Sequence, residues 1–434
     1  PEPKASRRAY AIGARVELAI ESLRALERIP MAAKQYDSPI PTGVRLTHFD
    51  PEFRKNPYPI LAELRERDPI HRDTELGRWV FTRHDDVWEI LRNPEYWSDP
   101  RKGNPDSFAR RFLGSGDEEP SMLLMDNPGH RRLRELARHP FTPRAVEVWR
   151  ERARTVAKRH VSAIEEDEFD LISAVANPIP TVVIAELLGV DPERHSDFKR
   201  WSDAVIKTAF SPISSEEDTK RADEARESLF SFFLEEIEKR RRAPADDLIT
   251  KMVQAEESGD HLTDEEISLQ CNLLLLAGNL TTSDLIGNAV MALVSNPDQQ
   301  ERLRADRSLM KNAVEEVLRF DSPVLGSGRI AHQDIEIGGV KISEGDSMST
   351  IVSAANRDPA AYPNPDRFDV TREDVHHQSF GGGRHFCLGA HLARLEAAET
   401  LHALFDRFPV LTPGSGGHEY ASNAGFRGLS HLSI

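Results

Sequence analysis

Apolar residues recur at spacings of three and four along most of the chain between Pro57 and Leu318. This periodicity predicts amphipathic helices, most clearly at residues 57–67, 86–91, 145–165, 182–188 and 222–241. Segments with strand character are found at 78–82, 335–342, which contains a hairpin turn at glycines 338–339, and 347–351, with a last strand pair at 410–411 and 429–434. The pattern therefore predicts a mainly α-helical protein of the α+β class, with small β-sheets set to one side.

One predicted helix is much longer than the others. Thr263 and Glu266 have the spacing of an N-terminal capping box, and the helical pattern continues to about Val294, before Pro297 ends it. Roughly thirty residues at 1.5 Å per residue give about 45 Å, enough to cross a whole domain. Residues 273–282 are apolar on every face and then become polar. We therefore expect a buried central helix, whose threonines could simply hydrogen bond to its own carbonyls.

Composition narrows the class of protein. The formal net charge of −16 over 434 residues argues against a protein that coats nucleic acid, since phosphate neutralisation needs a basic surface. Two cysteines cannot form a disulfide framework, and no apolar run approaches the ~18 residues needed to cross a bilayer. We expect a cytoplasmic protein without membrane insertion. Residues 1–45 are predicted to form a partly helical extension, and residues 46–434 a single domain.

The most informative segment is residues 379–394, in which three glycines, 381–383, precede Cys387. Consecutive glycines allow backbone to lie against a flat ligand. Cys387 stands at a predicted helix start, where unpaired amides stabilise an anion and lower the pKa of a thiol. Such a cysteine is a nucleophile or a metal ligand. Zinc would need more soft ligands than Cys271 offers, and a nucleophile would need a positioned base, for which His385 is a candidate.

The spacing Phe-x-x-Gly-x-His-x-Cys-x-Gly, from Phe380 to Gly389, resembles the haem-binding signature of the cytochrome P450 superfamily. In that family a cysteine thiolate is the proximal ligand of the haem iron. Three further segments match in the family's order, namely the oxygen-binding stretch of the central helix, the Glu-x-x-Arg helix and the segment whose arginine pairs with it, at residues 277–282, 316–319 and 365–368. The resemblance covers the chain from about residue 50 onward. It implies the cytochrome P450 fold, with the long helix lying over haem b.

The resemblance also implies roles for individual residues. The iron ligand would be Cys387, and the haem-contacting residues would be His130, Arg134, Ala277, Gly278, Arg329, Phe380, Gly381, His385 and Gly389. Within this set, the haem propionates would be held by His130, Arg134, Arg329 and His385. Oxygen activation would involve Thr281, Thr282 and Asn279. The substrate would lie against Leu273, Leu276, Ala277, Val324 and Leu325. A structural triad that fixes the cysteine loop would consist of Glu316, Arg319 and Arg367.

One position departs from the family's pattern. Leu280 stands where the family usually carries Asp or Glu, a residue that normally helps relay protons to iron-bound oxygen. The polar groups left nearby are Asn279, Thr282 and Asp284. Either water and these neighbours replace the acid, or oxygen activation is altered.

These features predict a haem-thiolate monooxygenase of the soluble bacterial type, which inserts one oxygen atom from O2 into a hydrophobic small molecule. The sequence has no dinucleotide fingerprint and no cysteine-rich iron–sulfur motif, so the electrons would come from a ferredoxin or flavodoxin-type protein. Residues 130–144 hold five arginines against one glutamate, a patch expected to attract an acidic donor. The alternatives are a peroxide-driven haem-thiolate enzyme and a haem sensor without turnover. Terpenoid, steroid, fatty acid and aryl acid substrates all fit the apolar positions.

Overall fold

The computed structural model describes residues 40–113, 121–209, 215–257, 260–423 and 425–434. Most of the predicted N-terminal extension, residues 1–39, lies outside these ranges. Its last residues pack onto the body of the protein, where Thr42 Oγ1 and the Gly43 amide donate hydrogen bonds of 2.8 and 3.0 Å to Asp73 Oδ1. Leu46 is buried beside Phe53 in a small apolar cluster.

Helices dominate the described residues, as predicted. They are α2 (Pro51–Lys55), α3 (Tyr58–Arg67), α4 (His84–Arg92), α5 (Gly129–Ala137), α6 (Pro143–Glu147), α7 (Arg150–Ser162), α8 (Pro178–Leu188), α9 (His195–Ala209), α10 (Glu216–Arg242), α11 (Leu248–Val253), α12 (Asp264–Ser295), α13 (Pro297–Ala305), α14 (Met310–Phe320), α15 (Val352–Ala355) and α16 (Ala390–Arg407). The strands are β1 (Ile70–Asp73), β2 (Arg78–Phe81), β3 (Glu256–Glu257), β4 (Asp260–His261), β5 (Ser327–Ile330), β6 (Ile335–Ile337), β7 (Val340–Ile342), β8 (Ser347–Thr350), β9 (His418–Tyr420) and β10 (Leu429–Leu432). The mainly α architecture with small sheets is confirmed.

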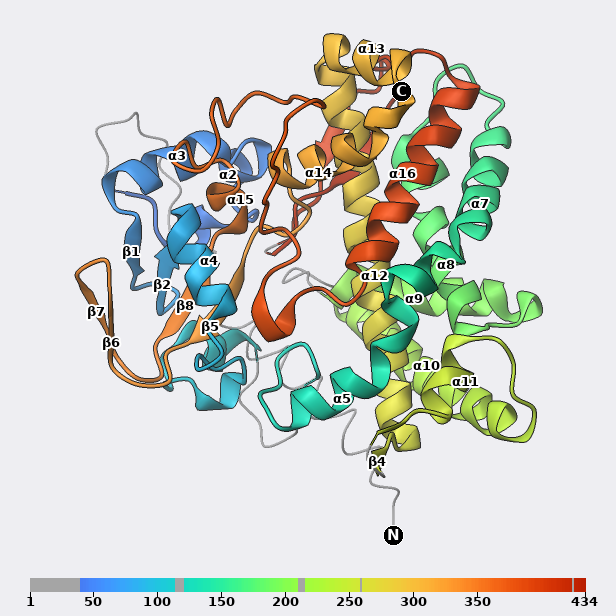
Figure 1. The fold of residues 1–434 in the computed structure, drawn as a ribbon, viewed down its shortest axis with the longest axis horizontal. Helices are drawn as coiled ribbons and strands as arrows, with labels where there is room; N and C mark the ends of the chain where they lie inside the picture. The colour runs from blue at the N-terminus through green and yellow to red at the C-terminus, as the bar shows by residue number, and fades with distance from the viewer. Residues whose placement is uncertain (1–39, 114–120, 210–214, 258–259, 424) are drawn as a thin grey trace.

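Helix α12 is the predicted central helix, and it runs through the helical half of the molecule (Figure 1). The Glu266 amide donates to Thr263 Oγ1, and the Thr263 amide donates to Glu266 Oε2, which completes the expected capping box. By length and composition α12 could cross a membrane, but 67% of its apolar window is buried inside the protein. It packs against α8, α10 and α16, so it is the core helix of this fold.

The main sheet has the order β1-β2-β8-β5 and lies on the opposite side of the molecule from α7 and α10 (Figure 1). Strands β2 and β8 run parallel, with Val80 opposite Ser349, and the other neighbours are antiparallel. The predicted hairpin is present as β6 and β7, whose turn residues Gly338 and Gly339 have φ of +57° and +80°. Both values lie in the left-handed region that two-residue hairpin turns require and glycine adopts freely.

The predicted strand at residues 410–411 is wrong. The side-chain amide of Gln300 occupies both backbone groups of Leu411, donating to its carbonyl at 3.0 Å and accepting from its N–H at 2.8 Å. The single N–H of Leu411 is therefore not available to a strand ladder. The partner of β10 is instead β9, with Leu429 opposite Tyr420.

Candidate active site

The cysteine loop, residues 379–389, leads into α16 and is closed by a hydrogen bond of 2.9 Å from the Cys387 amide to the Phe380 carbonyl. Gly381 and Gly383 have φ of +68° and +61°, values that side chains disfavour. A Cβ on Gly383 would also lie 3.0 Å from the Cα of Arg92 in α4. At this position glycine is therefore required by the close approach of α4 as well as by the turn.

Cys387 precedes Gly389, the N-cap of α16, by two residues. Its side chain is accessible, yet burial raises the pKa of the thiol, while the Gly389 amide, Arg134 and Arg394 oppose that shift. The helix start and the two arginines favour the thiolate, and burial acts against them. A coordinated metal cation reverses the balance, since a ligating thiol is deprotonated outright. The environment favours the metal-ligand interpretation of Cys387 over the nucleophile.

The side chain of His385 contacts a second histidine, which is not the arrangement of a base beside a nucleophile. Its ring lies 4.1 Å, between centroids, from that of His130 on α5. His130 Nδ1 and His385 Nε2 are buried, and neither has a hydrogen-bond partner among the described residues. Burial, reinforced by neighbouring arginines, lowers the pKa of His130 to about 4 and that of His385 to about 2. Both rings are neutral at physiological pH and offer nitrogens that lack partners.

Arginines surround the two imidazoles. Burial and the charge of Arg384 lower the pKa of Arg329 to about 10, and Arg134 donates to the Phe386 carbonyl at 2.6 Å. Asp126 is the carboxylate that reaches this group, and it is already bound by Arg384 at 2.8 Å and by Lys102 at 3.0 Å. The cluster thus holds more positive than negative charge.

These donors fit haem. Two propionates would pair with Arg134 and Arg329 and would accept from the orphaned ring nitrogens of His130 and His385, whose N–H protons can sit on either nitrogen. The structure brings all four predicted propionate partners to the cysteine loop. A thiol beside a cationic cluster would match the central iron and the propionate edge of an iron porphyrin.

The middle of α12 carries an accessible strip, although most of the helix is buried. Ala277 is exposed, and Gly278, Leu280 and Thr281 are half-buried. The Thr281 hydroxyl donates a hydrogen bond of 2.7 Å to the Ala277 carbonyl. In this structure it therefore makes the helix-internal bond that the sequence also allowed.

The other two predicted oxygen-side residues do not reach this strip. Asn279 donates to Thr181 Oγ1 of α8 at 2.7 Å and is buried. It stands about 200° around the helix from Ala277, so its amide faces α8. Thr282 is also buried.

Some of the predicted substrate-lining residues lie beside accessible space, and one does not. Leu273, Leu276 and Val324 are half-buried, as expected for positions beside accessible space. Leu325 is buried in the apolar cluster that contains Phe53, and its amide donates to the Gly425 carbonyl at 3.0 Å. The structure does not bring Leu325 to the accessible strip, because its side chain packs toward the sheet.

Glu316 and Arg319 form a fully buried ion pair, with Nε–Oε2 and Nη2–Oε1 distances of 2.7 and 2.8 Å. Arg319 also donates to the carbonyls of Asn356 at 3.0 Å and Pro365 at 2.8 Å. The side chain of Asn356 in turn accepts from the Gln378 amide and donates to Ser379 Oγ, both at 2.8 Å. The pair on α14 is thereby connected to the start of the cysteine loop.

The prediction that Arg367 completes this triad is wrong. Its side chain is 61% exposed, and its nearest carboxylate is Asp369 at 3.9 Å. The third member is Arg372, whose Nε lies 3.2 Å from Glu316 and whose guanidinium also donates to the carbonyls of Pro363 and Arg367. The segment curls around the Arg372 guanidinium, so Arg367 contributes its carbonyl and turns its side chain to solvent.

Glu315 is a site residue that the sequence did not reveal. It accepts two hydrogen bonds from Arg394 of α16, at 2.6 and 2.9 Å, and one from His377 Nε2 at 3.1 Å. Although burial raises its pKa, these bonds lower the pKa of Glu315 to about 2. Arg394 also lies 4.3 Å from the ring centroid of Phe380. The cluster fastens both ends of the cysteine loop to α14, but its partners are 79 residues apart in sequence.

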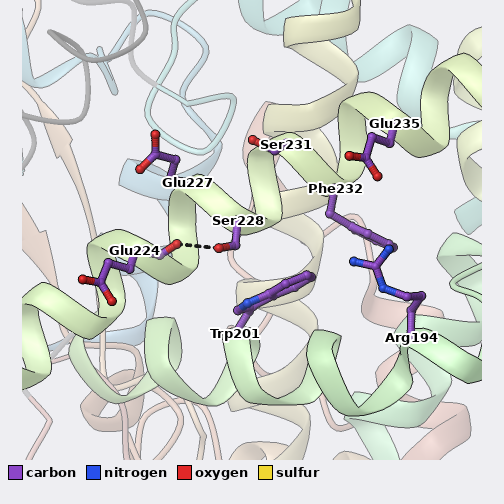
Figure 2. A pocket seen from close by; sticks show the side chains of 8 residues that line it. All are labelled: Arg194, Trp201, Glu224, Glu227, Ser228, Ser231, Phe232 and Glu235. Carbon is purple, nitrogen blue, oxygen red and sulfur yellow. Dashed lines mark hydrogen bonds between the residues drawn. The ribbon is translucent and has the colours of Figure 1, made fainter.

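A separate hollow of about 530 Å³ opens between α9 and α10 (Figure 2). Arg194 lies over the rings of Trp201 and Phe232, 5.7 and 5.1 Å from their centroids. The rim carries the carboxylates of Glu224, Glu227 and Glu235. None of the predicted site residues is among those that line it, so it is distinct from the cysteine site.

Comparison with known proteins agrees with this geometry. The family model for cytochrome P450 matches residues 113–425. Cytochrome P450 107B1 of Saccharopolyspora erythraea is 37% identical over 84% of this chain and 91% of its own length. The vitamin D(3) 25-hydroxylase of Pseudonocardia autotrophica is 38% identical over 89% of this chain and 95% of its own length. The crystal structure of CYP109E1 from Bacillus megaterium in complex with testosterone superposes with a TM-score of 0.79, at 32% identity, over 87% of this chain and 99% of that one.

The chain belongs to the cytochrome P450 family, and it is an enzyme of the P450 monooxygenase class, whose cofactor is haem.

The triad arrangement gives a first prediction. Replacing Arg372 with Ala removes one of the two cations that bind buried Glu316, while Arg319 stays in place, so the loss is that of charge-assisted hydrogen bonds, about 2 kcal/mol. We expect Arg372→Ala to lower the free energy of unfolding by that amount in a denaturant titration. Arg367→Ala is the matched control and should change it by less than about 0.5 kcal/mol. Equal effects of the two substitutions would contradict the assignment.

Proposed function

We propose that the enzyme holds haem b through Cys387 and inserts one oxygen atom from O2 into a hydrophobic small molecule, using electrons from a separate protein. The observation that carries this proposal is the accessible Cys387 thiol beside a buried, carboxylate-poor cluster of arginines and neutral histidines. Haem with a thiolate ligand would supply oxygen binding and O–O bond cleavage. The net reaction is RH + O2 + 2 H⁺ + 2 e⁻ → ROH + H2O.

The residues of the chain would anchor the cofactor, shape the space above it and hold a proton near the oxygen. His130, Arg134, Arg329 and His385 would anchor the propionates and fix the orientation of the ring, while Phe380, Gly381 and Gly389 would lie on the thiolate side. On the opposite side, Ala277 and Gly278 are small enough to let a planar group approach α12 closely. Thr281 would hold water or a proton near the oxygen once its hydroxyl turned from the Ala277 carbonyl.

Substrate class is proposed from the apolar strip and from the relatives. Leu273, Leu276 and Val324 offer only hydrocarbon surface, which suits a hydrophobic ligand. One similar protein is a vitamin D(3) 25-hydroxylase and another was solved in complex with testosterone, so steroids and related terpenoids are the first compounds to test. Binding should be visible as a spectral change of the ferric protein during titration with such a library.

The electron donor is proposed to be a ferredoxin or a flavodoxin-type protein, and the enzyme to be a soluble cytoplasmic protein with one catalytic domain over residues 46–434. The basic surface predicted on residues 130–144 is smaller than expected. Arg132 is bound by Asp260 and Glu266, and Arg131 pairs with Glu135. Arg138 and Arg144 remain exposed.

An exposed aromatic ring lies next to this surface. Phe386, beside Cys387, is 39% exposed and is tied to α5 by Arg134. Positive charge with an apolar centre, close to the metal ligand, suits an acidic redox partner.

Iron ligation can be tested directly. The reduced, carbon monoxide-bound protein should show the red-shifted Soret band of thiolate ligation, and Cys387→Ala should abolish it because the sulfur ligand is gone. Cys271→Ala is the matched control, since Cys271 is buried in α12, and should keep the band. A Cys387→Ala protein that retained it would refute the proposed ligand. Product formed with hydrogen peroxide alone, and none with the reductase system, would favour the peroxide-driven alternative.

Partner docking makes a further prediction. Arg138→Glu and Arg144→Glu should each slow electron transfer from an acidic ferredoxin, and the wild-type rate should fall steeply as ionic strength rises, because the attraction is long-range. Stopped-flow reduction of the substrate-bound protein measures both effects. Lys158→Glu, an exposed position on α7, should leave the rate unchanged. Rates that respond to neither salt nor these arginines would eliminate this surface as the docking site.

A further inference from the structure

Asp284 is the only charged residue of α12 beyond its first turn, from Ile267 to Ser295. It follows Thr281 by three residues and Leu280 by four, so it shares their face of the helix. Its side chain is 7% exposed and has no hydrogen-bond or ion-pair partner in the part of the chain that the structure describes. A buried carboxyl in the middle of an apolar helix is costly, so its presence needs a reason.

Asp284 occupies a space that only glycine provides. A Cβ on Gly428, just before β10, would lie 1.7 Å from Asp284 Oδ1. Any larger residue at 428 would displace the carboxyl. The position of this acid therefore depends on a second, distant segment of the chain and not on α12 alone.

The charges around Asp284 keep it without a counter-ion. The acid that acts on Asp284 is Asp321 at the end of α14, which accepts from Arg427 Nε at 2.6 Å and from Tyr58 OH at 2.5 Å. Arg427 is thus committed to Asp321, and it also lies 4.0 Å from the ring centroid of Tyr420 on β9. Arg357 covers the ring of Tyr58. Burial first, and then the charge of Asp321, raise the pKa of Asp284 to about 8.

Other polar residues near Leu280 are excluded by their contacts. Asn279 is bonded to Thr181 on α8, and Thr282 is a buried hydroxyl that does not ionise near neutral pH. Thr281 lies on the accessible strip, but its hydroxyl does not ionise near neutral pH and can only relay a proton that another group replaces. Among these groups, Asp284 is the one that can take up and release a proton in the physiological range.

We propose that Asp284 takes the place of the acid missing at position 280 and supplies protons to the oxygen side of the haem through the Thr281 hydroxyl. This inference rests on the proposed function. Thr281 would pass its own proton toward the oxygen atom that leaves as water and would receive the Asp284 proton in exchange. The Asp284 carboxylate would then regain a proton from water, while the two electrons come from the redox partner. Asp284 acts through Thr281 and is therefore a positioning and proton-carrying residue.

The test moves the acid along the helix. In holoenzyme with its electron donor, Asp284→Asn should keep the thiolate Soret band and the substrate-induced spectral change. Product formation should slow by about 100-fold, the usual contribution of an acid–base group, with reducing equivalents diverted to hydrogen peroxide. Leu280→Glu combined with Asp284→Asn should recover most of the coupling, because it restores an acid beside Thr281. Asp298→Asn, an exposed position on α13, is the isosteric control.

A second readout does not depend on turnover. An acid that is protonated in the folded state and ionised when unfolded releases a proton on unfolding, so it destabilises the protein progressively as pH rises between its two pKa values. The Tm of Asp284→Asn minus that of wild-type holoenzyme should therefore grow from pH 5 to about pH 8 and level off above it. An infrared band of a protonated carboxylic acid should be lost in the same variant.

The outcomes separate the two proposals. Absence of the thiolate Soret band in the wild-type protein would overturn the proposed function itself. A normal band together with unchanged coupling in Asp284→Asn would overturn only the proton-carrying role, as would a Tm difference that does not vary with pH.

Discussion

The buried ion pair of Glu316 and Arg319 is the contact on which the cysteine site depends. Either charge alone would be several kcal/mol unfavourable in this environment, so Arg319 must satisfy all of its donors within the protein. Its remaining acceptors are the backbone carbonyls of Asn356, Pro365 and Arg367. Because these acceptors are backbone carbonyls, the pair determines the path of the chain between α15 and the cysteine loop. Substituting the side chains of residues 356, 365 and 367 would leave these carbonyls in place.

The cysteine loop lies beside a cluster of positive charge that nearby carboxylates balance only in part. Arg134, Arg329 and Arg384 gather around two histidines that burial keeps neutral, and Asp126 balances only part of their charge. A ligand with two carboxylates would relieve this repulsion and would also satisfy the orphaned ring nitrogens. Binding to the folded state alone stabilises that state by mass action, so cofactor affinity and the stability of this half of the protein are linked. The thiol follows the same rule, since burial disfavours its anion until a metal cation is present.

Much of this architecture could be predicted because its signals are local. The capping box of Thr263, the turn at Gly338 and the spacing around Cys387 each depend on a few neighbouring residues. The failures share a different cause. Whether Arg367 or Arg372 turns back to Glu316 depends on the path of a whole loop, and the pairing of Glu315 with Arg394 joins residues 79 positions apart. Leu325 and Val324 alternate between the protein core and accessible space, and sequence alone gave no way to assign their sides.

The long-range contacts of the cysteine loop also affect the order in which parts of the protein can fold. Its contacts reach back almost to the front of the chain: Phe386 is bound by Arg134 from 252 residues away, and Arg384 binds the Tyr96 carbonyl across 288 residues. Contacts of this range form late, after the intervening chain has been ordered. During synthesis, α5 and most of α12 can fold while the loop has yet to leave the ribosome. A chain truncated before this loop would lack Cys387, the proposed haem ligand, however well its helices had formed.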